Sequence, residues 1–166
     1  MRDQQGRPFV GPAGQLLDNL LACAGLARTE VFITNVVKHR PPGNRDPELD
    51  ELDACDTFLR AQIEALRPLV IVTLGRFSLA KFVANVRSMR EVHGKAIHQN
   101  GATICAMYHP AAALHQGSLR SVLEQDFRGL PLIITRARER AGAAEAAATP
   151  VALAAAASVP EQMSLW

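Results

Sequence analysis

The segment Phe32–Arg45 constrains the fold of this chain more than any other part of the sequence. It begins as a β-branched apolar run and becomes basic and rigid within a few residues, which is typical of a buried strand that ends at a functional edge. We therefore predict a strand over Val31–Val37, followed by a stiff turn at Pro41–Gly43. In open α/β sheets, ligands bind beyond the carboxyl ends of the strands. Asn35, near the end of this strand, is accordingly the first candidate for a functional residue.

Helical and strand patterns alternate along the rest of the chain. Leucines at helical spacing predict a first helix, and Asp46-Pro47 carries the N-cap and first-turn signals of the next one. The run Leu69–Leu74 is apolar enough for a strand buried on both faces, and Asn100-Gly101 predicts a hairpin. A later helix, capped by Ser118, is expected to break or kink near Pro131. This alternation indicates a three-layer α/β/α fold with a mainly parallel central sheet.

The length and charge of the chain suit one folded domain with a tail. The chain has 166 residues, and we assign the domain to residues 1–140. Residues 141–160 are rich in alanine and contain two prolines, which predicts a flexible linker before a short binding tail at 161–166. The domain holds 18 Lys and Arg against 14 Asp and Glu, a net charge of +4. A positive excess of this size permits a polyanionic partner.

The cysteine content indicates a reducing compartment. Three cysteines, far apart and odd in number, do not form a disulfide framework. The sequence has no signal peptide and no apolar span of the roughly 18 residues that a membrane helix needs. We therefore expect a cytoplasmic, monomeric protein without a membrane partner.

Three separated segments together resemble the motifs of the family 4 uracil-DNA glycosylases, which are iron–sulfur enzymes. Gly6–Gly14 is similar to the first-loop motif, Thr34–Arg45 to the second motif and Tyr108–Leu114 to the last. Their order and spacing agree with the family, and the resemblance extends from about Gln4 to Arg138. It implies the three-layer fold of those enzymes and the excision of uracil from DNA. In that reaction the deoxyuridine flips into a pocket and its N-glycosidic bond is hydrolysed.

The resemblance also has gaps. The family's Gly-Glu-x-Pro-Gly segment, its first strand and two cluster cysteines would fall ahead of Met1, so we expect a chain that lacks this N-terminal part. The other two cluster positions fall at His39 and Cys55, and His replaces Cys as an iron ligand in some clusters. Two ligands would hold a four-iron, four-sulfur cluster poorly or not at all. The absent acidic motif would supply general-base help of about 10²–10⁴-fold, so weak or no cleavage of uracil is expected.

The resemblance implies roles for three residues. Phe9 would stack on the flipped base, and Asn35 would accept a hydrogen bond from uracil N3–H and donate one to O4. His109 would donate to O2 as the base leaves. From the residues alone, each has a plainer alternative: a core Phe, an Asn that bonds loop backbone, and a structural His.

Six further residues are candidates for contacts with DNA. Leu114 would enter the gap that the flipped base leaves, although a loop Leu packed on the neighbouring helix is an alternative. The others would contact the phosphate backbone or remain as solvated surface groups. They are Lys38, Arg40, Asn44, Arg45 and Arg76.

The last five residues resemble the pentapeptide that binds the bacterial sliding clamp. Gln162, Leu165 and Trp166 would be the anchors, delivered to the partner by the linker, and a chance apolar terminus is the alternative. Two other functions stay open beside the glycosylase. One is a non-catalytic DNA-binding or clamp-tethered protein of the same fold. The other is an unrelated phosphate-binding α/β enzyme that uses the Gly-rich loop as an anion cradle.

Overall fold

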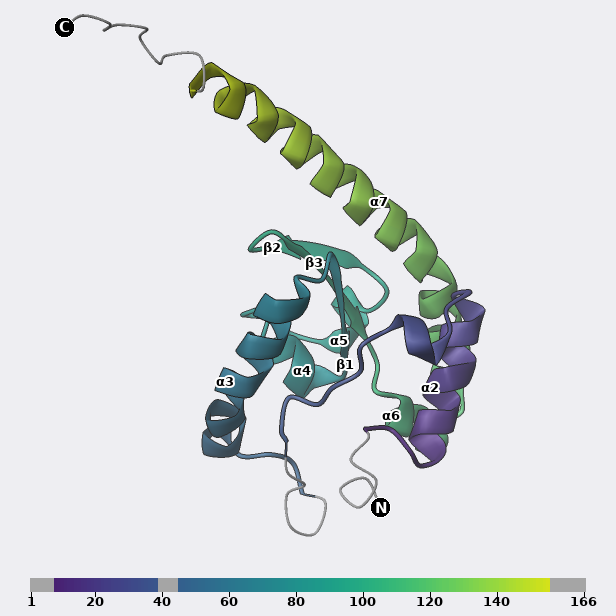
Figure 1. The fold of residues 1–166 in the computed structure, drawn as a ribbon. Coiled ribbons are helices and arrows are strands. Elements are labelled where there is room, and N and C mark those ends of the chain that lie inside the picture. The colour runs from purple at the N-terminus through teal and green to yellow at the C-terminus, as the bar shows by residue number, and fades with distance from the viewer. Residues whose placement is uncertain (1–7, 39–44, 156–166) are drawn as a thin grey trace, which may run out of the picture.

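The computed structural model describes residues 8–38 and 45–155. A small sheet lies between two groups of helices, as Figure 1 shows. The elements are, in chain order, α2 (Pro12–Cys23), the 3-10 helix η1 (Arg28–Glu30), α3 (Leu49–Leu66), β1 (Val70–Leu74), α4 (Arg76–Ala80), α5 (Met89–Val92), β2 (Ala96–Gln99), β3 (Ala102–Met107), α6 (Pro110–His115) and α7 (Ser118–Ala155). Within these residues, no helix has both the length and the apolar character to cross a membrane.

The sheet has the strand order β1-β3-β2. β1 runs parallel to β3, with Val70 opposite Thr103 and Leu74 opposite Met107. β2 pairs with β3 in the antiparallel sense through a turn at Asn100-Gly101, whose φ angles are 50° and 78°. These angles confirm the predicted hairpin, because a tight type I′ turn needs a positive φ at both central positions.

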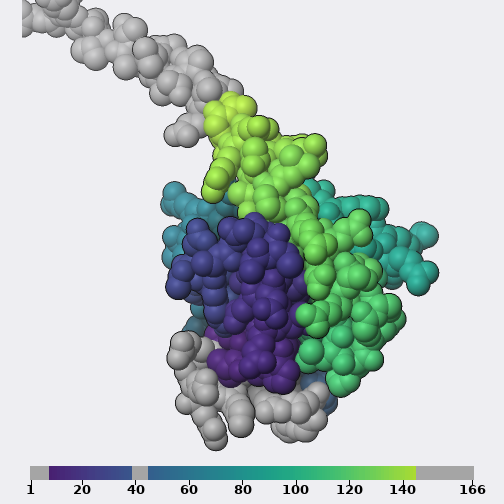
Figure 2. Space-filling model, turned by 90° about the vertical axis from the view of Figure 1, so that its right-hand side faces the viewer, coloured from purple at the N-terminus to yellow at the C-terminus, as the bar shows by residue number. Residues whose placement is uncertain are grey.

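β3 is the central strand and buries both of its faces. Cys105 and Met107 face an apolar cluster shared with α2 and α7, while Ile104 and Ala106 face a second cluster beside α4. Side chains alternate between faces along a strand, so one strand serves both halves of the core. The α/β/α layering is therefore confirmed, and Figure 2 shows α2 in purple lying directly against α7 in green.

β1 is less buried than the sequence predicts. Only Thr73 within it is fully buried, and the other four residues are half-buried. The prediction of a strand enclosed on both faces was therefore wrong for β1. The physical reason is position, since β1 lies at the edge of the described sheet and β3 occupies the centre.

The segment Val31–Val37 is extended but is not a strand, so that prediction was wrong. A β-strand forms ladder hydrogen bonds with a neighbouring strand. The described sheet pairs only β1, β2 and β3 with one another. A side chain of α3 bonds the segment instead, because Thr34 Oγ1 donates to Gln62 Oε1 across 3.2 Å. The β-branched pattern thus predicted a strand where the structure has none, with bends at Val31, Val36 and Val37.

α7 continues through the positions where the sequence predicts a break, so neither Gly129 nor Pro131 ends the helix. One buried stripe packs it onto the body of the protein, and such packing outweighs the loss of one backbone hydrogen bond at a proline. The stripe consists of Leu123, Phe127, Leu130 and Ala137. The helix is described through Ala155, and alanine has the highest helix propensity. The flexible linker at 141–160 stays a prediction. The predicted tail at 161–166 lies outside the described residues.

Candidate active site

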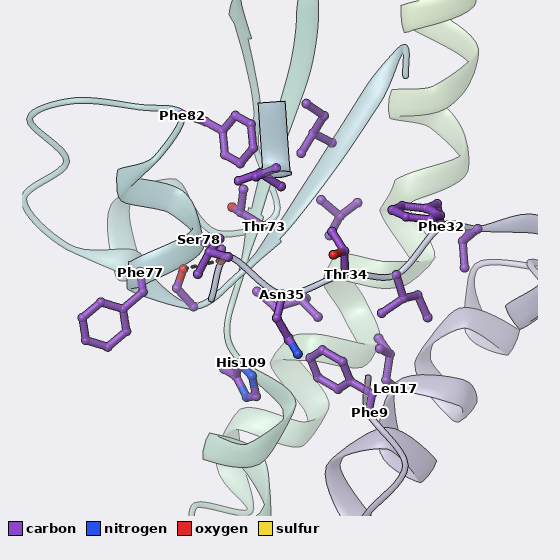
Figure 3. Close-up of a pocket in the computed structure, with 18 of the residues that line it drawn as sticks. Phe9, Leu17, Phe32, Thr34, Asn35, Thr73, Phe77, Ser78, Phe82 and His109 are labelled. Carbon is purple, nitrogen blue, oxygen red and sulfur yellow. Dashed lines mark hydrogen bonds between the residues drawn. The ribbon is translucent and has the colours of Figure 1, made fainter. Parts of the chain in front are cut away.

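A pocket of about 780 Å³ lies between β1, α3 and the extended segment that precedes α3. Phe9, Asn35 and His109 all line it. Figure 3 shows the Asn35 amide directed toward the ring of Phe9, with His109 beside them. The three residues come from a loop, from the extended segment and from the end of β3. The structure therefore brings all three predicted base-contacting residues into one cavity.

His109 follows β3 and is the N-cap of α6. Its Nδ1 accepts a hydrogen bond from the backbone N–H of Ala111 across 3.1 Å. Because Nδ1 is the acceptor, the neutral imidazole carries its proton on Nε2. Pro110 suits the first helical position, since proline has no N–H to satisfy there. The helix cap thus sets both the orientation and the tautomer of a hydrogen-bond donor.

Phe9 has an unusual backbone conformation next to His109. Its φ is 57°, in the left-handed region that aromatic residues rarely adopt, and such positions cluster at functional sites. The Phe9 ring stacks on the His109 imidazole with centroids 5.4 Å apart and planes inclined by 24°. Phe9 is only 7% exposed and packs with Leu17 and Leu20. Phe9 is therefore a core residue and a pocket residue at once.

Gly75 ends β1 at a point where the sequence indicates only a turn. Its φ is 86°, and a Cβ added there would lie 3.1 Å from the Cβ of His109. The Gly75 N–H donates to the carbonyl oxygen of Met107 across 2.8 Å, which joins the ends of β1 and β3. Glycine thus allows both the positive φ and the close approach to His109. A glycine after a strand is too common a pattern to reveal this role.

Lys38 directs its ammonium group into the wall of the pocket. Nζ donates to Thr34 Oγ1 (2.8 Å), to the Asn35 carbonyl oxygen (3.0 Å) and to Gln62 Oε1 (2.8 Å). Burial lowers the pKa of Lys38, and the nearby Cys55 sulfur acts in the opposite direction. The ammonium group of Lys38 is thus bonded within the protein, and its contact with a DNA phosphate stays an untested prediction. No sequence pattern points to Gln62, because its partner Lys38 is 24 residues away.

Two candidate DNA contacts, Arg45 and Arg76, form ion pairs on the surface. Arg45 pairs with Glu51 across 2.8 Å, and this hydrogen bond holds the pKa of Glu51 below its usual value. Arg76 pairs with Asp46. Exposed pairs of this kind contribute little to stability, so either arginine can exchange its partner for a phosphate at little cost. Their contact with DNA remains a prediction.

Leu114 lies on α6 and is 48% exposed, whereas the adjacent Ala113 is 7% exposed. Ala113 is thus the buried residue of this pair, and for Leu114 both the predicted wedge and packing on the neighbouring helix stay open. An exposed leucine in the helix that His109 caps is consistent with the predicted wedge. Arg40 and Asn44 lie outside the described residues.

Cys55 is the one predicted cluster ligand within the described ranges, since His39 lies outside them. Its Sγ accepts a hydrogen bond from the backbone N–H of Lys38 across 3.2 Å. In the part of the chain that the structure describes, no three His, Cys, Asp or Glu side chains are grouped so that they could hold a metal ion. One thiolate does not hold a four-iron cluster, so no step of the chemistry below is assigned to one.

Comparisons with known proteins agree with this geometry. A family model described as the Uracil DNA glycosylase superfamily matches residues 1–128. The type-4 uracil-DNA glycosylase of Sulfurisphaera tokodaii is 47% identical over 135 residues, which cover 76% of this chain and 61% of that protein. The corresponding protein of Saccharolobus solfataricus is 48% identical over 135 residues, covering 76% and 62%, and that of Archaeoglobus fulgidus is 46% identical over 135 residues, covering 76% and 67%.

The chain thus spans between 61% and 67% of the length of these curated relatives. The matched region of the family model includes every segment that contributes Phe9, Asn35 or His109 to the pocket. On this match, and on the shared cavity of the three motif residues, the chain belongs to the uracil DNA glycosylase superfamily.

Proposed function

We propose that this protein removes uracil from DNA by hydrolysing the N-glycosidic bond of a flipped deoxyuridine. The main support for the proposal is that Phe9, Asn35 and His109, from three separate parts of the chain, line one cavity. The relatives described above are uracil-DNA glycosylases, which supports the same substrate class for this chain.

Asn35 recognises the base in this proposal. Its amide oxygen accepts from uracil N3–H and its amide nitrogen donates to O4, whereas cytosine presents the reverse pattern. Cytosine would leave buried polar groups unpaired, and sites that read hydrogen bonds reject such analogues by about 10⁴–10⁵. Phe9 supplies an aromatic face, and stacking contributes about 1–3 kcal/mol per base. That gain is similar in size to the few kcal/mol needed to flip a nucleotide.

His109 supplies the electrostatic part of catalysis. As the bond between C1′ and N1 breaks, its electron pair moves onto uracil, so negative charge develops on O2 and positive charge on C1′. The Nε2–H of His109 stabilises O2, and one such donor contributes about 2.7–4 kcal/mol elsewhere. The oxygen of a water molecule forms the new bond to C1′, and the proton that it loses neutralises the departing uracil.

Activation of this water is the slow part of the proposed reaction. Glu30 and Asp46 are the two carboxylate residues in the described lining of the pocket. Glu30 Oε2 accepts a hydrogen bond from the Ala27 N–H across 2.7 Å, and Asp46 pairs with Arg76. General-base help contributes about 10²–10⁴-fold, so a pocket whose carboxylates are engaged elsewhere should excise uracil slowly.

The engaged carboxylates also favour a second candidate function, recognition of uracil in DNA without cleavage. A single-turnover assay separates the two, with the protein in excess over an oligonucleotide that contains one deoxyuridine. Released uracil is measured by mass spectrometry, and a thymidine oligonucleotide is the control. Slow release that His109→Asn slows further, by about 10²–10³-fold, supports excision, and preferential binding without release supports the second function. Neither release nor preference would contradict both.

The C-terminal tail is proposed to tether the protein to a bacterial sliding clamp. The proposal rests on the sequence of the tail, with Gln162, Leu165 and Trp166 as anchors. α7 extends away from the sheet ahead of this tail (Figure 1), which suits a tether. A pulldown with the tail peptide tests it, and equal clamp binding after Leu165→Ala and Trp166→Ala would contradict it.

The four-iron, four-sulfur cluster of the family also remains a proposal for this chain. With His39 and Cys55 as its predicted ligands, we expect the cluster to be held poorly. Iron analysis of protein purified without oxygen tests this expectation. A full complement of about four iron atoms per chain would show that the cluster is held well.

A further inference from the structure

The ammonium group of Lys38 uses its entire hydrogen-bonding capacity inside the protein. An ammonium has three N–H donors and no acceptor. The three acceptors are Thr34 Oγ1, the Asn35 carbonyl oxygen and Gln62 Oε1, at 2.8, 3.0 and 2.8 Å. Thr34 Oγ1 also donates to Gln62 Oε1 across 3.2 Å. These contacts form one network that joins the extended segment to α3.

This network contacts the Thr34 side chain on one side of Asn35 and the Asn35 carbonyl group on the other. Thr34 precedes Asn35, and the carbonyl group that Lys38 bonds follows the Cα of Asn35. Within the described residues the segment has no strand partner, so no ladder of backbone hydrogen bonds holds it. A recognition group must be held within roughly 0.5 Å, and a displacement of about 1 Å can cost 10²-fold.

We propose that Lys38 and Gln62 are positioning residues that hold Asn35 in the geometry for reading uracil. This inference rests on the proposed function, because it assigns a purpose to the placement of Asn35. It also reverses the expectation from sequence, in which a lysine in a basic run contacts phosphate. A phosphate contact would need at least one N–H of Lys38 to point toward solvent, and all three have acceptors within the protein.

Binding measurements on the full chain distinguish the two roles. The variants are Lys38→Met and Gln62→Leu, and the probes are a deoxyuridine oligonucleotide and the same oligonucleotide with a tetrahydrofuran abasic site. If the residues position Asn35, both variants weaken binding to the uracil probe by about 10- to 100-fold and binding to the abasic probe by no more than about twofold. If Lys38 contacts phosphate, Lys38→Met weakens binding to both probes alike. It also lowers by about 1 the slope of log affinity against log salt concentration, and this result would overturn the proposal.

Two matched variants control for general damage. Gln62→Glu keeps an oxygen acceptor for Lys38 and Thr34, so it should retain the uracil preference that Gln62→Leu loses. Lys95→Met removes an exposed lysine whose Nζ donates to the Glu91 carbonyl oxygen across 2.6 Å. This variant should bind both probes as tightly as the wild type does. If Gln62→Glu loses as much of the preference for the uracil probe as Gln62→Leu does, the hydrogen-bond network does not position Asn35.

Hydrogen exchange of the free protein separates failure of this inference from failure of the proposed function. Lys38→Met and Gln62→Leu should speed exchange of peptides that cover 31–38 by about tenfold and leave peptides from β3 unchanged. Unchanged exchange at 31–38 would overturn the positioning role whatever the DNA results. If the wild-type protein shows no preference for uracil while exchange at 31–38 responds, the proposed function fails and the anchoring of the segment stands.

Discussion

Gly14 lies so close to Phe9 that a Cβ added to Gly14 would be 1.7 Å from the Phe9 carbonyl oxygen. Gly14 is in the first turn of α2, and Phe9 precedes that helix with a φ of 57°. The absence of a side chain at Gly14 therefore allows the loop to fold back against the helix. This backbone contact sets the position of the aromatic ring in the pocket.

Gly14→Ala should destabilise the protein and displace the Phe9 ring. Overpacking costs about 1–3 kcal/mol, which for a chain of this length lowers Tm by roughly 2–12 °C. Gly129→Ala is the matched control, because Gly129 lies in α7 and a Cβ there would have no neighbour within 4 Å. That change should stabilise the helix by about 0.5–1 kcal/mol. Calorimetry of the two variants tests the contrast, and equal Tm values would contradict it.

His109→Asn should slow uracil release by about 10²–10³-fold, because the donor to O2 is lost. An asparagine is a good N-cap, so its side-chain oxygen can still accept from the Ala111 N–H and stability should change little. His109→Ala loses the cap as well and should destabilise the protein by about 1 kcal/mol more. Single-turnover release and urea unfolding check the two parts. Unchanged release in both variants would remove His109 from the reaction.

Asn35→Asp should abolish the preference for uracil while the backbone of the segment stays in place. A carboxylate keeps the acceptor but loses the amide donors, so uracil O4 is left unpaired. An unpaired buried group costs about 1–3 kcal/mol, which corresponds to roughly 5- to 150-fold in affinity. Anisotropy titrations with uracil, thymine and cytosine oligonucleotides measure this preference. A variant that still prefers uracil as the wild type does would show that another group reads the base.

Thr73→Val should stabilise the protein by about 1–2 kcal/mol. Thr73 is 1% exposed, and within the described residues its Oγ1 has no hydrogen-bond partner, so valine removes a buried polar group that costs free energy. The matched control is Thr103→Val on the adjacent strand, where Oγ1 lies 3.1 Å from His98 Nδ1. Loss of that bond should destabilise by about 0.5–1.5 kcal/mol. Urea unfolding measures the free energy of unfolding of both variants. Changes of the same sign in the two variants would contradict the prediction.

The His93–Asp126 pair predicts a pH dependence of stability. His93 Nδ1 lies 2.9 Å from Asp126 Oδ2, and the Asp126 side chain is 9% exposed. Burial raises the pKa of Asp126 above its usual value, and the contact with His93 offsets part of this rise. A carboxyl whose pKa is higher in the folded state stabilises the fold when protonated. Its contribution is fully present below the unfolded pKa of about 4 and is lost as pH rises through the folded pKa.

Asp126→Asn removes this titration and is the reference for the pH experiment. The free energy of unfolding of the wild type, relative to this variant, should fall as pH rises above about 4. Urea unfolding of both proteins at a series of pH values measures the difference. A difference that stays constant, or one that rises with pH, would show that burial of Asp126 does not dominate its pKa.

Local patterns determined the layered α/β class and the residues of the pocket. The Asn100-Gly101 turn was predictable because the preference for a positive φ is a property of those two residues. Phe9, Asn35 and His109 were identifiable because each lies in a short motif. Hydrophobic periodicity likewise reports which face of an element is buried, and it needs no knowledge of the partner.

Only the tertiary structure decided which segments pair and where Lys38 points. Val31–Val37 has the composition of a strand, but ladder hydrogen bonds depend on a neighbour that the segment cannot specify. Lys38 lies in a basic run that favours a phosphate contact, and its ammonium turns inward because α3 places Gln62 beside it. α7 passes Pro131 because the packing of its apolar stripe outweighs a local helix breaker. In each case the deciding energy comes from residues distant in sequence, which local patterns do not contain.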